Sequence, residues 1–494
     1  MSLYGTDLLA LLPELIVVIT ACLVIALDPI TPASRRDLLA WLSLGALALC
    51  IGLTGGQISE LNVRVSAFSD LAVVDAYARF WKILLYGVTS ATILLSLPYL
   101  KAERIHLGEY YGFILLALSG MMVMVSGADL LTIYLGTELM SLSLYVMTGL
   151  NRSKPRSLEA AAKYFVLGAF SSGILLYGIS LLYGMAGSTK LASIASAIGT
   201  RGADDPLLLI ATILVAVGFG FKLAAVPFHM WTPDVYQGAP TSVTAFMAVA
   251  AKAASFAAFM RVFVEGLGGL KADWSLLFLL IAIATLVLGN VVAIVQTNIK
   301  RMLAYSSIAH AGYALIGFVA AGRAVGASGG TPGLASVMIY LALYSFMTLG
   351  AFAVIGMLRK GGIEGEEIED FTGLAKRQPL AAFLMMVFMV SLAGIPPTAG
   401  FIGKFYVFMA AVESGLAWLA AIALIFAAVS AYYYMRVVMV MYMREPDPSS
   451  VAPRLVTSPA LSFVLACAVA GVILFGLFPN PLVSFALQSV LTLK

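Results

Sequence analysis

The sequence predicts an all-α membrane protein with about fourteen membrane-spanning helices, and two observations support this class. First, 61% of the 494 residues are hydrophobic and only 11% are charged, whereas a soluble protein carries roughly 25% charged residues. Second, apolar runs recur from end to end, and each is long enough to cross a hydrocarbon core about 30 Å thick. The connections between the runs are too short to form a soluble domain of useful size.

The apolar runs divide into two sets of seven. The run 380–412 is too long for one straight span and contains Pro396 and Pro397, so it predicts a single interrupted helix. The first run has no basic segment before it, which indicates a retained span rather than a cleaved signal peptide. The runs are 8–28, 38–55, 78–98, 108–126, 129–149, 157–185, 206–228, 241–262, 274–297, 301–321, 333–357, 380–412, 416–443 and 457–478.

The positive charges, within a net charge of +4, are distributed unevenly between alternate connections. Fifteen Lys and Arg residues follow odd-numbered spans, and six, including Arg261, follow even-numbered spans. Because Lys and Arg are retained on the inner face, this bias predicts that both termini lie on the outer, periplasmic face. The acidic connector 361–378 is then expected to be a solvated inner-face loop, with a docking surface for a partner subunit as the alternative.

Motifs for cofactor chemistry are absent from the sequence. The three cysteines, Cys22, Cys50 and Cys467, lie far apart inside apolar runs and have no spacing typical of a disulfide framework or a zinc site. The chain also lacks a phosphate-binding loop, a convincing dinucleotide fingerprint and a haem-ligand histidine pair. We therefore expect no cofactor, no metal and no redox chemistry in this chain itself.

Five ionisable residues fall well inside the predicted spans: Glu138, Lys163, Lys222, Lys252 and Lys404. Each would cost about 2.5–3.5 kcal/mol at the centre of a bilayer, so each must face a polar interior or another charge. Glu138 and Lys163 lie on consecutive spans and predict an ion pair, with either a structural or a functional role. The other three lysines have no further carboxylate to match them. Desolvation favours the neutral form of such a lysine, which suits a proton relay, whereas snorkelling to an interface is the alternative.

A proline break lies beside each of the two deepest lysines. Pro227 follows Lys222, and the pair Pro396 and Pro397 precedes Lys404. Proline has no N–H, so each break frees backbone carbonyls that need water or polar side chains inside a membrane. The carbonyls concerned are those of Leu223, Leu392 and Ala393. One broken helix with a lysine in each half predicts two related, transporter-like halves.

Two histidines are further candidates for proton transfer because their unperturbed pKa suits it. His229 follows Lys222 by seven residues, and His310 follows Ser306 by four, which places each pair on one face of a continuous helix. The alternative for each is a hydrogen-bonded structural histidine. Glu159, Asp129 and Asp234 lie near span ends and are expected to need no functional explanation. The tyrosines 432–434 are expected to pack or to lie at an interface.

Three segments together resemble a known family. They are Thr137-Glu138-Leu139, the stretch KLAAVPFHMWTPD at 222–234 and the stretch RMLAYSSIAHAGY at 301–313. They are similar to the antiporter-like membrane subunits of respiratory complex I, a family that also includes subunits of multi-subunit cation/proton antiporters and membrane-bound hydrogenases. The segment GIPPTAGFIGKF at 394–405 resembles most closely the bacterial subunit N branch, NADH–quinone oxidoreductase subunit N. The likeness covers nearly the whole chain.

The resemblance implies a fold of two inverted five-helix repeats, each with a broken helix. The implied boundaries are 1–107 for three N-terminal helices, 108–263 and 264–443 for the two repeats, and 444–494 for a C-terminal helix. It also implies a proton path through Glu138, Lys163, Lys222, Lys252 and Lys404, in which Glu138 and Lys163 tune Lys222. Lys252 would lead to Lys404, which would exchange protons with one side of the membrane.

The implied function is proton translocation by one subunit of a translocase, coupled to quinone reduction elsewhere in the complex. NADH, FMN, iron–sulfur clusters and quinone would then belong to partner subunits. The partners would be other complex I membrane subunits, including neighbouring antiporter-like subunits, and the lipid bilayer, with no nucleic acid. The location would be the bacterial cytoplasmic (inner) membrane. Two alternatives stay open: a subunit of a cation/proton antiporter or membrane-bound hydrogenase, and a structural spacer whose charges only hold helices together.

Overall fold

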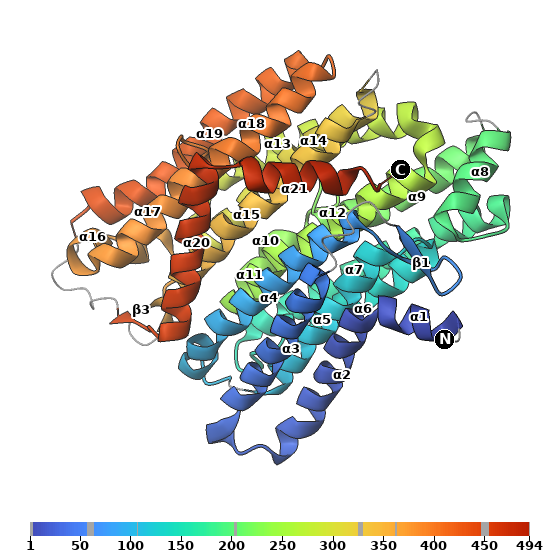
Figure 1. Ribbon diagram of the computed structural model, residues 1–494. Coiled ribbons are helices and arrows are strands. Elements are labelled where there is room, and N and C mark those ends of the chain that lie inside the picture. The colour runs from blue at the N-terminus through green and yellow to red at the C-terminus, as the bar shows by residue number, and fades with distance from the viewer. Residues whose placement is uncertain are drawn as a thin grey trace.

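The computed structural model describes residues 3–56, 64–105, 107–201, 205–324, 330–360, 363–445 and 454–493. Most of the described chain is helical, and the long helices run roughly side by side as one bundle (Figure 1). The helices of the first half are α1 (Leu3–Ala10), α2 (Leu12–Leu27), α3 (Asp37–Gly56), α4 (Ala76–Ala102), α5 (Glu109–Ser126), α6 (Leu130–Thr148), α7 (Pro155–Ala186), α8 (Leu191–Arg201), α9 (Pro206–Leu223), α10 (Trp231–Gly238), α11 (Thr241–Phe246) and α12 (Lys252–Arg261).

The second half continues the same architecture. Its helices are α13 (Lys271–Ile294), α14 (Ile299–Arg323), α15 (Thr331–Met357), α16 (Leu374–Arg377), α17 (Pro379–Ala393), α18 (Ala399–Glu413), α19 (Ala417–Met443), α20 (Pro459–Leu477) and α21 (Asn480–Val490). Single 3-10 turns lie at Asp28–Ile30, Ala33–Arg35, Gly268–Leu270 and Ile368–Phe371, and π-helical turns lie at Met247–Ala251 and Val262–Gly266.

Thirteen helical segments in the described part of the chain are long and apolar enough to cross a membrane. Each coincides with one of the predicted spans. The remaining predicted span, 380–412, is divided into α17 and α18, each of 15 residues, as the interrupted helix predicted from its prolines. The all-α membrane class is therefore confirmed, and a count of fourteen depends on taking α17 and α18 together as one span.

The core of the bundle consists of the segment Thr241–Gly266, which joins α11 and α12 through a π-helical turn, together with α14 and α15. The most apolar stretches of these three segments are 94% to 100% buried, whereas those of α2, α3, α7, α19 and α20 are 33% to 39% buried. Peripheral helices therefore present apolar side chains outward, as expected for helices in contact with lipid. The three central segments are enclosed by protein.

Side-chain caps fix several helix starts. The carboxylates of Asp75, Asp129 and Asp205 accept backbone N–H groups in the first turns of α4, α6 and α9, and the Asn298 side chain does the same for α14. Such caps satisfy N–H groups that have no partner within the helix. Asp129 was expected to need no functional explanation because it lies near the end of a predicted span. In the structure it is buried and caps α6.

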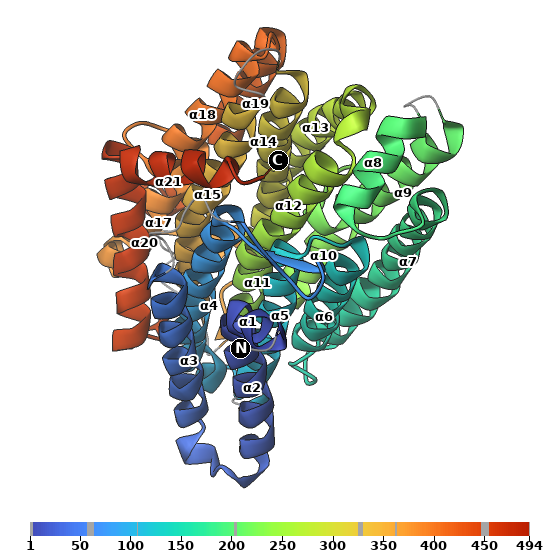
Figure 2. The ribbon, with the colours of Figure 1, turned by 45° about the vertical axis from the view of Figure 1, so that its right-hand side comes forward.

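Two small sheets and one transverse helix complete the structure. Strands β1 (Val65–Ala67) and β2 (Ala72–Val74) form an antiparallel hairpin, and β3 (Leu358–Lys360) pairs with both β4 (Ile363–Glu364) and β5 (Arg454–Leu455). Helix α21 lies across the bundle and packs on α15 and α4 (Figure 2).

Two expectations about the connections are wrong. The part of the connector 361–378 that is described is not a freely solvated loop, because Glu364, Ile368, Phe371 and Leu374 are buried. Arg261 does not lie in a loop either. The helical segment continues through it, and its guanidinium is fully buried against Asp75 and Glu265.

Candidate functional site

The first helix break ends α9 one residue after Lys222. Ala224, with φ of +58°, terminates the helix, and the indole of Trp231 at the start of α10 donates to the Phe221 carbonyl at 3.0 Å. The Lys222 side chain is buried and donates to Ser141 Oγ at 2.6 Å. A cation in the last turn of a helix also interacts favourably with the helix dipole. The predicted lysine beside a broken helix is confirmed.

The carboxylate nearest to Lys222 is that of Glu138 on α6, with Oε1 at 3.9 Å from Nζ. Glu138 also accepts a hydrogen bond from Ser172 on α7. This contact sets the register of the two helices: Ser172 lies level with Glu138. Lys163 lies nine residues earlier on α7, or about 13 Å along a helix axis.

The predicted ion pair between Glu138 and Lys163 is therefore wrong. The Lys163 ammonium contacts Glu159 at 2.7 Å and Asp234 at 2.9 Å. Its side chain is 44% exposed, so it lies at the margin of the protein rather than in the core. The sequence correctly predicted that α6 and α7 lie next to each other, because they are consecutive spans. It could not predict how far along each helix the two residues lie.

Asp234 on α10 joins three helices, although its position near the end of a predicted span suggested no such role. It accepts from Lys163 on α7 and from Arg301 Nη1 on α14, the latter at 2.7 Å. Burial alone would raise the pKa of Asp234, but the hydrogen bonds from Arg301 and Lys163 outweigh burial and lower it below the ordinary value. Asp234 therefore remains ionised and holds α10 between α7 and α14.

Lys252 lies in the enclosed core segment, directly after the π-helical turn Met247–Ala251. Its ammonium donates to both the carbonyl and the hydroxyl of Ser307 on α14, each at 2.5 Å. The side chain is buried, and the two contacts satisfy donors that would otherwise be costly in the core. π-Helical turns inside α-helices occur often at functional sites.

His310 is the centre of a hydrogen-bonded group on α14. Its Nδ1 lies 2.5 Å from the Tyr340 hydroxyl on α15, and its Nε2 lies 3.1 Å from the Tyr434 hydroxyl on α19. The Tyr434 hydroxyl also contacts the hydroxyl of Ser306. Tyr434 was expected to pack or to lie at an interface, and its polar contacts were not foreseen. The four-residue spacing of Ser306 and His310 was the available local signal.

The second break separates α17 from α18 and forms the site of Lys404. The ammonium of Lys404 donates to the carbonyls of Leu392 at 3.1 Å and Ala393 at 2.7 Å. These are the two carbonyls that the prolines were predicted to free, so the buried lysine satisfies them directly. The same ammonium lies 5.1 Å from the centre of the Tyr313 ring on α14, a cation–π distance.

His229 does not share a helix face with Lys222, because α9 ends at Leu223 and His229 lies in the connection to α10. Its ring is half-buried, and the Nδ1 atom is buried without a hydrogen-bond partner in the described part of the chain. The face shared by Lys222 and His229, as expected from their spacing, is therefore not formed.

Helix α14 links Lys252 of the first half to His310 and Lys404 of the second half. Ser307 holds Lys252, His310 connects α15 and α19, and Tyr313 contacts Lys404. The structure therefore brings Glu138 to Lys222 through α6 and α9, and brings Lys252 and Lys404 to one shared helix. Within the described ranges, no group of three or more His, Cys, Asp or Glu side chains could hold a metal ion.

Buried charges outside this group escaped the sequence reasoning. Glu14 on α2 pairs with Lys82 on α4 at 2.5 Å, and both side chains are less than a tenth exposed. A second network joins Asp75, Arg261 and Glu265, with both pairs at 2.9 Å. The first pair joins α2 to α4, and the second network joins the start of α4 to the core segment that contains Arg261. Removing one partner of a buried ion pair is costly, because the other charge is left buried without compensation.

The comparisons with known proteins agree with this geometry. Residues 127–430 match the family model described as NADH:quinone oxidoreductase/Mrp antiporter, transmembrane. NADH-quinone oxidoreductase subunit N 2 of Rhizobium meliloti is 48% identical over 481 residues, which cover 97% of each chain. Subunit N of Trichlorobacter lovleyi is 45% identical over 98% of this chain and 97% of its own length.

Solved structures show the same fold. A chain of respiratory complex I from Thermus thermophilus with bound aureothin is 32% identical, with a TM-score of 0.78 over 96% of this chain and 98% of its own. A chain of the Mrp complex from Dietzia has a TM-score of 0.84 at 21% identity, over 98% of this chain and 97% of its own, and supports the fold alone. The chain belongs to the family of antiporter-like membrane subunits of NADH:quinone oxidoreductases and Mrp antiporters.

Proposed function

We propose that this chain is the proton-translocating, subunit N-type membrane subunit of an NADH–quinone oxidoreductase. It would move protons through Glu138, Lys222, Lys252, His310 and Lys404 while redox chemistry proceeds in other subunits. The observation that carries the proposal is the placement of a buried lysine at each helix break, with protonatable or hydroxyl partners between them. Uncompensated lysines are expensive in a membrane, and they typically mark ion or proton pathways.

The first step rests on the contact between Glu138 and Lys222. A negative charge 3.9 Å from an ammonium stabilises its protonated form, so a change in the charge or position of Glu138 would load or unload Lys222. In this step Glu138 acts on Lys222 directly, rather than as one member of a pair with Lys163. Lys163 would instead act with Asp234 and Arg301, which connect α7, α10 and α14.

The second step concerns Lys252 and Lys404. Ser307 and the carbonyls at the second break accept from these two lysines, and no carboxylate among the described residues pairs with either lysine. Their protons would therefore be held by neutral acceptors, which bind an ammonium less strongly than a carboxylate does. His310, with its two tyrosine partners, lies on the helix between them and would complete the path. His229, which lies half-buried in the connection between α9 and α10, would serve at the first break.

The partners and cofactors follow from the family. The Glu138 side chain is 23% exposed although it lies in a membrane-spanning helix. A carboxylate facing lipid is costly, so a neighbouring membrane subunit would cover it. NADH, FMN, iron–sulfur clusters and quinone would be bound by other subunits of the complex. The chain would lie in the bacterial cytoplasmic membrane with both termini on the periplasmic face, as the distribution of Lys and Arg predicts.

The internal symmetry is part of the same proposal. Residues 108–263 and 264–443 would be two inverted repeats, preceded by three helices within 1–107 and followed by a C-terminal helix within 444–494. Two parallels support it: α9 and α17 both end in a residue with positive φ, Ala224 and Gly394, and both are followed within a few residues by a second, short helix. A cation/proton antiporter subunit is disfavoured because the relatives at 45% and 48% identity are named as oxidoreductase subunits.

The test is Lys222→Ala in membranes that carry the assembled complex. Proton translocation and NADH–quinone activity are both expected to fall strongly while assembly is retained. The matched control is Lys376→Ala, which removes an exposed lysine paired with the exposed Glu445 and should change neither activity. Normal proton translocation per electron in Lys222→Ala would contradict the proposal and reduce the buried lysines to a structural role.

A further inference from the structure

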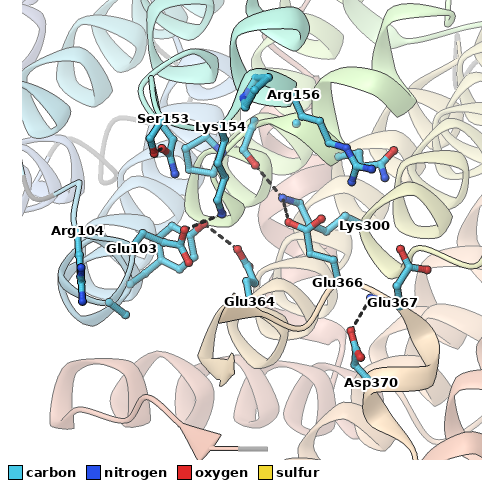
Figure 3. A pocket seen from close by; sticks show the side chains of 18 residues that line it. Glu103, Arg104, Ser153, Lys154, Arg156, Lys300, Glu364, Glu366, Glu367 and Asp370 are labelled. Carbon is cyan, nitrogen blue, oxygen red and sulfur yellow. Dashed lines mark hydrogen bonds and ion pairs between the residues drawn. The ribbon is translucent and has the colours of Figure 1, made fainter. Parts of the chain in front are cut away.

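A polar cavity of about 870 Å³ opens among the connections that carry most of the Lys and Arg residues (Figure 3). It lies between the end of α4, the connection from α6 to α7, the junction of α10 and α11, the start of α14 and the segment 364–370. Cations and carboxylates both line it, among them Glu103, Lys154, Lys300 and Glu366. None of the candidate residues in the spans lines this cavity, so the proton path described above does not account for it.

Glu364 lies at the inner wall of this cavity and is buried, with 6% of the residue exposed. Its Oε2 accepts from the Tyr99 hydroxyl at 3.0 Å, and its Oε1 accepts from the Thr241 hydroxyl. The Tyr99 oxygen in turn accepts from the Thr241 backbone N–H at 2.9 Å. The carboxylate is thus held in a closed ring of neutral hydrogen bonds.

The cations around Glu364 are shared with other acceptors that lie closer to them. Arg359 Nη1 is 3.9 Å from Glu364 but 3.2 Å from Glu103, which also pairs with Lys154 at 2.7 Å. Lys300 donates to the Ala239 carbonyl at 2.8 Å and lies 3.4 Å from Glu366. Glu364 therefore shares the Arg359 guanidinium with Glu103, which lies closer to it, and its hydrogen bonds are made to the neutral hydroxyls of Tyr99 and Thr241. Burial has the largest effect on the carboxyl group of Glu364 and raises its pKa. The charges of Lys300 and Arg359 and the hydrogen bond from Thr241 lower this pKa in part, whereas Glu366 raises it. The pKa of Glu364 therefore lies above the ordinary value.

The ring connects the cavity to the core of the bundle. Thr241 is the first residue of α11, and the helical segment that it begins continues through the π-helical turn to Lys252. Lys252 is eleven residues farther on, or about 16 Å along the helix. Glu364 and Tyr99 thus connect the polar cavity to the start of the helical segment that carries the buried Lys252.

We propose that Glu364 is a proton-uptake group of this subunit, which exchanges protons between water in the cavity and the buried path that includes Lys252. This inference rests on the proposed function and adds to it the residue and the face through which protons reach the core. The geometry that carries it is a buried carboxyl group, hydrogen-bonded to neutral hydroxyls, that separates a polar cavity from the first turn of the Lys252 helix.

The step is a simple proton exchange. A hydronium ion in the cavity water gives a proton to a carboxylate oxygen of Glu364: one O–H bond of the hydronium breaks, one O–H bond forms on the carboxyl group, and a water molecule remains in the cavity. The neutral acid can then donate to the Thr241 hydroxyl, which is a donor and an acceptor at once. The carboxylate is restored when the proton is passed on along the buried path and is accepted by a neutral Lys252 amine, which becomes an ammonium; no oxidant or reductant is required.

The test compares two charge removals in the same cavity, with the assembled complex in proteoliposomes. Glu364→Gln keeps an acceptor for Tyr99 and Thr241 but cannot carry the proton, so proton translocation is expected to fall at least tenfold. Glu366→Gln removes a carboxylate that is paired with Lys300 on the same wall and should retain translocation. The pH dependence of translocation on the cavity side should also flatten in Glu364→Gln, which a purely structural role would not produce.

A second variant provides chemical rescue. Glu364→Ala leaves space beside Tyr99 and Thr241, and formate, a small carboxylic acid, should restore translocation in this variant but not in Glu364→Gln. Full translocation by Glu364→Gln, equal losses in Glu364→Gln and Glu366→Gln, or failure of formate to restore Glu364→Ala would overturn the inference. If these results occur while Lys222→Ala abolishes translocation, the proposed function stands and only the role of Glu364 falls.

Discussion

Replacing Glu138 with Gln removes a negative charge 3.9 Å from the Lys222 ammonium. Two unit charges at this distance interact by about 4 kcal/mol at an effective dielectric constant of about 20. Glu138 is 23% exposed, so we halve the interaction to about 2 kcal/mol, which corresponds to roughly a 30-fold change in an equilibrium constant. About 30-fold is therefore the largest fall in proton translocation expected in Glu138→Gln through the charge on Lys222.

The informative comparison is Lys163→Ala. If Glu138 acts on Lys222 directly, Lys163→Ala should have a much smaller effect, because the Lys163 ammonium contacts Glu159 and Asp234 instead. Both variants would be reconstituted with the rest of the complex, and proton translocation per electron would be measured with NADH as donor. Equal losses in the two variants would refute this assignment and return Lys163 to the tuning pair with Glu138.

Three further results are expected. Arg261→Met leaves two buried carboxylates without their cation, so thermal unfolding should show a loss of about 3–5 kcal/mol, and unchanged unfolding would contradict the buried network. Asp234→Asn should lower the free energy of unfolding by about 1 kcal/mol at neutral pH, because the cation partners of Asp234 are partly exposed. The pKa of Asp234 is lowered in the folded protein, so its contribution to stability is complete above the ordinary value of 3.8 and is lost as the pH falls through the folded-state pKa. Unfolding measured at several pH values should therefore show the difference from wild type vanish at low pH. Tyr434→Phe removes the hydroxyl between Ser306 and His310 and should lower translocation per electron at a stability cost of only about 1 kcal/mol, whereas normal translocation would exclude the hydroxyl from the path.

Local chemistry explains what the sequence could predict. Pro227, Pro396 and Pro397 mark both helix breaks because a residue without an N–H acts within one turn of its own position. The same reasoning identified the carbonyls of Leu392 and Ala393 that Lys404 binds. Long apolar runs likewise located the spans, since bilayer thickness sets their length.

Contacts between distant segments could not be predicted in this way. Ser306 and Tyr434 meet across 128 positions of the chain, and Lys252 meets Ser307 across 55. The position of Lys163 depends on the relative register of α6 and α7, which hydropathy does not encode. Arg261 was counted with the loop residues. Inside the bundle its positive charge is neutralised by two carboxylates, which offsets the cost of a charge within a span.

The shared role of α14 has a mechanical consequence. Ser307 and Tyr313 are six residues apart, or about 9 Å along one rigid helix, and they contact Lys252 and Lys404 respectively. A rotation of α14 about its axis would therefore turn both contacts away in the same movement, giving two distant charge sites a single degree of freedom. Proton loading at one lysine would reach the other as a displacement of the helix, and a cross-link that fixes α14 to α13 is expected to slow proton exchange at both.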